Sequence, residues 1–175
     1  MISADPSAEA AVPDEVCSAW AVFLGRWYWD WFVTLTFKEP PHPEQADKLY
    51  RVWVSKINRK LYGVRWAKHG KGVRWARATE LQRRGAIHFH ALMGGDGLST
   101  ERRLSWMDAW HALGGVAGFA RIEVPENQGA VLGYCSKYVA KGGNIDLSPT
   151  MGQPVQRGMF LAPPFRCATH RKGSR

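Results

Sequence analysis

The chain has 175 residues, of which 45% are hydrophobic and 22% are charged, and its 24 Lys and Arg against 15 Asp and Glu give a net charge of +9. This composition is that of a soluble globular protein, and because no apolar run is long enough to cross a bilayer, we expect no membrane association. Three cysteines without CxxC spacing argue against a disulfide framework, so we expect a cytoplasmic protein. The excess positive charge favours a polyanionic partner, with nucleic acid ahead of an anionic membrane.

Three segments are expected along the chain. Residues 1–26 form an N-terminal extension with a short helix that starts at Asp14 and ends near Leu24. Residues 27–143 carry the strand and helix patterns of the main domain. Residues 144–175 are rich in Pro and Gly and end in a basic tail.

The first predicted strand covers residues 29–38 and stops before Pro40 and Pro41. Thr34 and Thr36 lie on one face of it and are candidates for contacts with backbone phosphates. The alternation places large apolar side chains on the other face, which enters the core: Trp27, Trp29, Trp31, Val33, Leu35 and Phe37.

A helix is predicted from Pro43 to Gly63, and a basic loop over residues 63–72 follows it. Basic residues around an aromatic ring suit single-stranded nucleic acid, because cations follow the phosphates and the ring stacks on a base. An ordinary charged loop with a half-buried tryptophan fits the pattern equally well. The residues concerned are Arg65, Trp66, Lys68 and Lys71.

Two strand patterns flank residues 83–85, and the second carries His88 and His90. Residues two apart on a strand share a face, so both imidazoles point the same way. If residues 83–85 form a three-residue loop with Gly85 in a left-handed conformation, Glu80 lies directly opposite His88 on that face. A two-residue loop would instead place Glu80 opposite Phe89, on the wrong face.

Glu80, His88 and His90 together supply two imidazoles and a carboxylate with open positions, which is a catalytic type of metal site. Such ligands suit Mn²⁺ or another first-row ion, with Mg²⁺ also possible. Small Ala76 and Ala78 beside Glu80 would leave room for a substrate backbone. The simpler explanation is a pair of hydrogen-bonded strand histidines.

Ser99 or Thr100 is expected to begin a further helix, and residues 118–124 form another strand. Arg121 of that strand joins the polar face that carries the histidines. Further arginines are expected to contact nucleic acid: Arg74, Arg83 and Arg84.

The last predicted helix contains two tyrosines and two lysines at four-residue spacing. Tyr134 and Tyr138 fall on one helical stripe with Lys137 and Lys141. Taken without the histidines, this pattern is as well explained by a pair of packed aromatic rings.

The order of elements, without the N-terminal helix, is βαββαβ. It predicts an α+β fold with an antiparallel sheet of four to five strands in a ferredoxin-like or RRM-like plan. The helices are expected on one face of the sheet and the metal site on the other. The last helix must then bring its tyrosines to the metal face.

Three motifs in a fixed order resemble those of the HUH endonucleases, and among them the rolling-circle replication initiator (Rep) proteins of plasmids, single-stranded DNA phages and circular single-stranded DNA viruses. FVTLTF at 32–37 resembles the first motif, and HFH at 88–90 the histidine motif, with Glu80 at the spacing of the third metal ligand. YCSKYVAK at 134–141 resembles the tyrosine motif. The resemblance covers residues 27–143, which makes this segment an HUH endonuclease domain.

The resemblance implies site-specific nicking and joining of single-stranded DNA at a replication origin. A tyrosine attacks the scissile phosphate near the metal and forms a 5′-phosphotyrosine. The tyrosine pair resembles two-tyrosine phage initiators, while YCSK resembles the one-tyrosine viral type and favours Tyr134. No Walker sequence GxxxxGK[ST] occurs, so a host helicase and polymerase are expected partners.

Three alternatives stay open. A plasmid-mobilisation relaxase or single-strand transposase would share the metal and tyrosine chemistry. A non-catalytic single-stranded nucleic-acid-binding module would need aromatics but no carboxylate and histidine set. A metal-dependent hydrolase would use water, and both tyrosines would then be structural.

Overall fold

The computed structural model describes residues 14–81, 85–129, 133 and 145–152. Within these residues, no helix has the length and apolar character needed to cross a membrane. The helices and strands, with two short 3-10 turns, are α1 (Asp14–Leu24), β1 (Trp31–Phe37), α2 (Pro43–Tyr62), η1 (Ala67–His69), β2 (Arg74–Leu81), β3 (Ile87–Gly94), η2 (Leu98–Thr100), α3 (Arg103–His111), β4 (Ala117–Glu123) and β5 (Ile145–Leu147).

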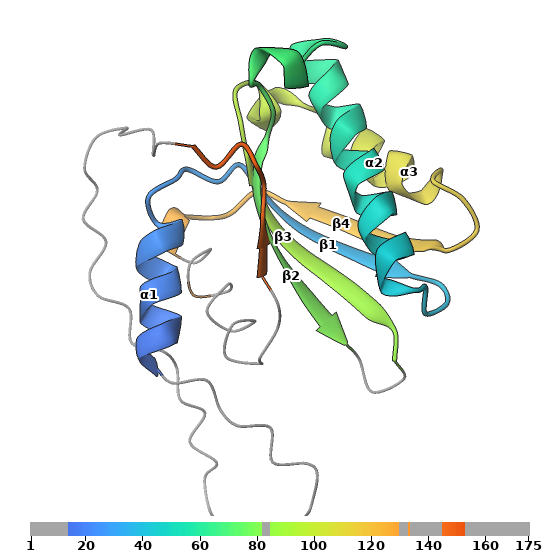
Figure 1. Cartoon of the computed structure of the whole chain (residues 1–175), viewed down its shortest axis with the longest axis horizontal. Helices are drawn as coiled ribbons and strands as arrows, with labels where there is room; N and C mark the ends of the chain where they lie inside the picture. Colours follow the sequence, from blue (N-terminus) through green and yellow to red (C-terminus); the bar gives the residue numbers. More distant parts are fainter. Residues whose placement is uncertain (1–13, 82–84, 130–132, 134–144, 153–175) are drawn as a thin grey trace, which may run out of the picture.

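The five strands form one antiparallel sheet in the order β4-β1-β3-β2-β5 (Figure 1). The path from β1 through α2, β2, β3 and α3 to β4 is the predicted βαββαβ plan, so the α+β fold class is confirmed. The fifth strand comes from the segment expected to be a C-terminal tail, and it pairs with β2. Its three residues were too few to show a period of two.

The helix α2 begins and ends as the sequence predicts. Pro43 stands at its start with Glu44 in the first turn, and Gly63 ends it at a φ of 81°. The Gly63 N–H donates to the Arg59 carbonyl at 3.1 Å, which satisfies one of the last free carbonyls of the helix. The helix α3, by contrast, begins at Arg103, because Thr100 belongs to a separate turn and donates its hydroxyl to the Gly97 carbonyl.

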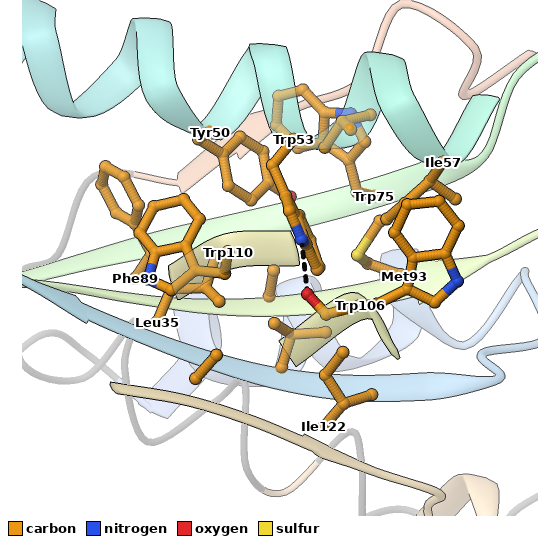
Figure 2. Packing of buried hydrophobic residues seen from close by; sticks show 14 of the residues in the cluster. Leu35, Tyr50, Trp53, Ile57, Trp75, Phe89, Met93, Trp106, Trp110 and Ile122 are labelled. Atoms are coloured by element: carbon orange, nitrogen blue, oxygen red, sulfur yellow. Dashed lines mark hydrogen bonds between the residues drawn. The ribbon is translucent and has the colours of Figure 1, made fainter. Parts of the chain in front are cut away.

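The main core lies between the sheet and helices α2 and α3. The buried Trp53 of α2 donates its indole N–H to the Trp106 carbonyl of α3 at 2.9 Å (Figure 2), which joins the two helices above the sheet. Other buried members of this core include Trp31, Val33, Leu35, Tyr50, Ile57, Trp75, Phe89, Met93, Trp110, Ala120 and Ile122.

A second apolar cluster covers the opposite face of the sheet, where α1 packs (Figure 1). The expectation that helices lie on one face holds for α2 and α3 and is wrong for α1. Trp27 and Trp29 also belong to this second cluster, because β1 starts only at Trp31 and the alternation does not extend back to them. Ala76 and Ala78 are buried in the same cluster, so they leave no room for a substrate.

One charged side chain is buried on the helix side of the sheet. Arg77 of β2 is 3% exposed and forms ion pairs with Asp47 of α2, at 2.8 Å, and with Asp146 of β5. Its guanidinium also lies over the rings of Tyr50 and Phe89, 4.6 and 4.3 Å from their centroids. Arg77 therefore connects α2 to both strands at this edge of the sheet.

Candidate functional site

The register of the strands arranges polar side chains in rows across the face of the sheet opposite α2 and α3. Directly paired residues of neighbouring strands share a face, so each row crosses several strands. The apolar row consists of Ala76, Leu92 and Phe32. The middle row consists of Ala78, His90, Thr34 and Arg121. The outer row consists of Glu80, His88 and Thr36.

Glu80 of β2 lies directly opposite His88 of β3, which is the register that a three-residue loop predicts. Gly85 has a φ of 75°, the left-handed conformation that this loop was expected to require. His90 lies diagonally across from Glu80, and its Nε2 is 3.1 Å from Glu80 Oε2. Because Ala78 is small, nothing bulky beside His90 blocks this diagonal contact.

His90 is held on both sides. Its Nδ1 lies 3.3 Å from the Thr34 hydroxyl, and the Phe32 ring stacks against the imidazole at 6.4 Å with an interplanar angle of 15°. The side chain is 8% exposed. Thr34 thus engages one ring nitrogen and leaves Nε2 directed at Glu80, an arrangement by which outer partners commonly orient a metal-binding histidine.

The donor atoms suit a divalent metal, since imidazole nitrogens and a carboxylate are ligands for Mn²⁺ and related ions. The ring centroids of His88 and His90 are 6.3 Å apart on the same face. Across the described residues, however, no three His, Cys, Asp or Glu side chains gather around a point that would hold an ion. The structure therefore brings Glu80 and His90 into contact and places His88 beside them without completing a three-ligand cluster.

The two threonines of the first motif differ in their surroundings. Thr34 contacts His90, whereas the Thr36 hydroxyl accepts a hydrogen bond from the Phe119 N–H at 2.7 Å and lies 3.2 Å from the Phe119 carbonyl. Thr36 thus bridges an irregularity in the β1–β4 pairing between Leu35 and Phe37. In β4, Arg121 is exposed and pairs with Glu123 at 2.7 Å.

The basic loop, residues 63–72, lies at the other end of β2 from Glu80. Six residues of strand separate Arg74 from Glu80, which corresponds to roughly 20 Å. The loop's charged side chains are exposed, and Trp66 is half-buried. A Cβ added at Gly72 would come within 3.3 Å of the Trp66 ring, so the ring packs over this glycine. The loop and the histidine face are separate regions of the surface.

Six of the predicted site residues lie outside the described part of the chain: Tyr134, Tyr138, Lys137, Lys141, Arg83 and Arg84. The approach to the tyrosine segment is described at Gln128. Its side-chain amide accepts from the Trp29 N–H and donates to the Trp29 carbonyl, both at 2.9 Å. Gln128 was missed in the sequence because a lone glutamine after a proline carries no pattern. It attaches the chain before the tyrosines to the residues that precede β1.

Comparison with known proteins adds a family. The family model for replication-associated protein ORF2 matches residues 30–143, which is more than half of the chain and includes all three motifs. Neither the curated proteins nor the solved structures contain a match. The match agrees with the resemblance to Rep-type rolling-circle replication initiators. The chain therefore belongs to the family of the replication-associated protein ORF2.

Proposed function

We propose that this protein nicks and rejoins single-stranded DNA at a replication origin, by attack of a tyrosine on a phosphate next to a bound divalent metal. The observation that carries the proposal is the contact between Glu80 and His90, with His88 directly opposite Glu80 on the same face. A carboxylate and two imidazoles at adjoining positions of one sheet face, in a replication-associated family, fit a metal-dependent nuclease.

Glu80, His88 and His90 would hold the metal, either Mn²⁺ or Mg²⁺. When bound, such an ion supplies a Lewis acid that polarises the scissile phosphate and stabilises the charge that develops on it. Thr34 keeps His90 oriented through Nδ1, and Phe32 limits the tilt of its ring. These contacts reduce the entropy lost when the ligands are ordered around an ion.

The tyrosine hydroxyl would form a new bond to phosphorus as the bond from phosphorus to the 3′-oxygen breaks. The tyrosine proton leaves its oxygen, and the departing 3′-oxygen takes up a proton, so the products are a 5′-phosphotyrosine and a free 3′-hydroxyl. Ionising a tyrosine with a pKa of about 10 at pH 7 costs roughly 4 kcal/mol. Lys137 or Lys141, one helical turn from a tyrosine in the sequence, would offset this cost through its positive charge. Attack by another 3′-hydroxyl reverses the step and joins strands.

The pairing of Gln128 with Trp29 supports an approach of the tyrosine segment to the histidine face. Trp29 belongs to the apolar cluster on that face, and Gln128 is only six residues before Tyr134. Tyr134 is the proposed main nucleophile, with Tyr138 as a second nucleophile or a positioning group.

The DNA partner is supported by charge. The net charge of +9 favours a polyanion, and Arg121 stands exposed in the middle row beside Thr34. Lys68 and the other basic residues of the loop extend the positive surface at the far end of β2. Strand opening and synthesis would come from a host helicase and polymerase.

The proposal is tested with a pool of labelled random-sequence single-stranded DNA and Mn²⁺, followed by a denaturing gel. We expect a labelled adduct that survives SDS, and we expect EDTA or Glu80→Gln to abolish it. DNA affinity should change by less than about threefold in Glu80→Gln, because phosphate contacts come mainly from Lys and Arg. Thr79→Val, on the helix side of the same strand, is the matched control and should retain the adduct.

Three results would count against the proposal. An undiminished adduct in EDTA would reject the metal mechanism. Salt-sensitive DNA binding without any adduct or cleavage would indicate a non-catalytic binding module. Cleavage without an adduct would point to a hydrolase that uses water.

A further inference from the structure

A polar cavity of about 380 Å³ lies at the end of the sheet where β1 and β2 begin and β3 ends. It is separate from the pair of Glu80 and His90, which stands near the opposite end of β2. The cavity is within the size range of small-ligand sites. Its lining combines two aromatic residues, three charged residues and a glycine-rich turn: Trp27, Tyr28, Asp30, Arg74, Gly95, Asp96, Gly97 and Ser99.

Two glycines make this construction possible. A Cβ at Gly94 would lie 2.4 Å from the Tyr28 carbonyl oxygen, and one at Gly95 would lie 2.6 Å from the Tyr62 hydroxyl. Both distances are too short for any side chain, so the turn after β3 contacts its neighbours through bare backbone. The Gly95 N–H also donates to Asp30 Oδ2 at 2.9 Å, which fixes that carboxylate at the cavity wall.

The charges at the cavity are close enough to act on one buried group. Burial raises the pKa of the Tyr62 hydroxyl, the carboxylates of Asp96 and Asp30 raise it further, and Arg74 opposes them. Tyr62 also forms a hydrogen bond with the Asp96 backbone. A guanidinium and two carboxylates therefore surround one small volume.

Arg74 brings unused donors to this volume. Among the described residues none accepts a hydrogen bond from its guanidinium, none forms an ion pair with it, and its Nε is buried. Trp27 is 6% exposed, and its indole N–H likewise lacks an acceptor in the described part of the chain. Buried donors normally have an acceptor, so these two point to a ligand that supplies one.

The mixture of charges decides the class of ligand. A phosphate alone would meet Arg74 but would be repelled by Asp30 and Asp96, and a metal cation would meet the reverse conflict. A nucleobase carries acceptors and donors on different edges and is neutral. Tyr28, 55% exposed at the rim, offers a ring for stacking.

We propose that this cavity binds an unpaired guanine base of single-stranded DNA. Guanine presents O6 and N7 as a pair of acceptors that match the two-pronged arginine, and its N1–H and N2 amino group are donors for a carboxylate. Arg74 would therefore bind one edge, and Asp96 or Asp30 would bind the other. Tyr28 would stack on the face of the base.

The position of the cavity fits a DNA strand that crosses the sheet. Arg74 shares the face of β2 that carries Glu80, and the basic loop comes directly before Arg74 in the chain. A strand held at the proposed metal site and followed to the basic loop would pass the cavity. The inference rests on the proposed function in that it needs a DNA substrate, and it adds base recognition at a distance from the cleaved phosphate.

The test measures equilibrium binding by fluorescence anisotropy in EDTA, so that cleavage plays no part. Labelled oligothymidylate of about twelve nucleotides is compared with the same strand carrying one central guanine, inosine, adenine or cytosine. We expect the guanine strand to bind about tenfold more tightly than oligothymidylate, since one good bidentate contact is worth on the order of 1.4 kcal/mol or tenfold. Inosine, which lacks the N2 amino group, should lose much of this gain in the unmodified protein.

Variants assign the effect to the cavity. Arg74→Met should reduce the guanine preference to less than about twofold, and Asp96→Asn should reduce discrimination between guanine and inosine. Lys68→Met, the matched control in the basic loop, should weaken all strands by a similar factor and leave the preference intact.

Equal affinity of the unmodified protein for all five strands would overturn the guanine proposal and leave the nuclease proposal standing. A guanine preference that survives Arg74→Met would place base recognition elsewhere and also overturn it. Absence of any single-stranded DNA binding would overturn both proposals, whereas a guanine preference without cleavage in Mn²⁺ would retain the cavity and reject the nuclease.

Discussion

The Thr34 hydroxyl lies 3.3 Å from Nδ1 of His90, and the two residues are directly paired across β1 and β3. Through this contact the first sequence motif touches the histidine motif. The opposite ring nitrogen of His90 is 3.1 Å from Glu80 Oε2. A threonine that at first was considered for phosphate contacts is therefore placed to orient a proposed metal ligand.

Thr34→Val should lower Mn²⁺ affinity by about 10- to 100-fold, the usual effect of removing an outer partner of a metal-binding histidine. Isothermal titration calorimetry measures the affinity directly. Thr79→Val makes the same chemical change on the other face of the sheet and should leave it unaltered. Equal Mn²⁺ affinity in the Thr34 variant and the unmodified protein would show that the contact does not serve a metal site.

The basic loop predicts a salt-dependent association with single-stranded DNA. For Z neutralised phosphates, the slope of log K against log salt should be about −0.7Z, and Lys68→Ala should make it less steep by about 0.7 if this lysine neutralises one phosphate. Binding titrations at several salt concentrations give the slope. A slope near zero would remove nucleic acid as the main partner.

Arg77 predicts a large effect on stability. Arg77→Ala removes the ion pairs with Asp47 and Asp146 together with the contacts over two aromatic rings, and should lower the free energy of unfolding by about 3 kcal/mol. Urea denaturation checks this value. The exposed Arg59 of α2 is the control, and its alanine variant should differ by less than about 0.5 kcal/mol. Similar losses in the two variants would refute the structural role of Arg77.

Asp47 predicts a specific loss of stability in acid. Burial opposes its ionisation, but hydrogen bonds from Arg51 and Arg77 outweigh burial and lower the pKa of its carboxyl. A lowered folded-state pKa stabilises the protein above the ordinary aspartate value of about 3.9, and this contribution disappears as pH falls through the folded value. Asp47→Asn should therefore lose less stability than the unmodified protein between about pH 5 and pH 2.5. Parallel pH profiles of the free energy of unfolding would contradict this.

Much of the fold could be predicted because its periodicities are strong. The alternation in β2 and β3 and the apolar stripe of α2 identified those elements, and Gly85 pointed to the loop that fixes the register of the hairpin. Trp27 and Trp29 misled the prediction, since an alternating run does not reveal where a strand starts. The side of the sheet chosen by α1 depends on packing with residues far along the chain, such as Leu92, and no local pattern encodes it.

The site was only partly predictable for a similar reason. Glu80, His88 and His90 follow from local alternation and one turn. The cavity around Arg74 joins three segments that are distant in the sequence, and its glycine-rich turn reads simply as a turn. The role of Thr34 beside His90 depends on β1 pairing with β3, which is a property of the whole sheet.

The most direct test of the account identifies the residue that carries DNA after reaction with single-stranded DNA and Mn²⁺. The adduct is digested with protease and nuclease, and the modified peptide is sequenced by mass spectrometry. We predict a phosphonucleotide on Tyr134, with the adduct lost in Tyr134→Phe and retained in Tyr138→Phe, because phenylalanine removes only the hydroxyl. The reverse pattern would move the role to Tyr138, and adducts in both single variants but not in the double variant would mean that either can serve. An undiminished adduct in the double variant would contradict tyrosine chemistry in this protein.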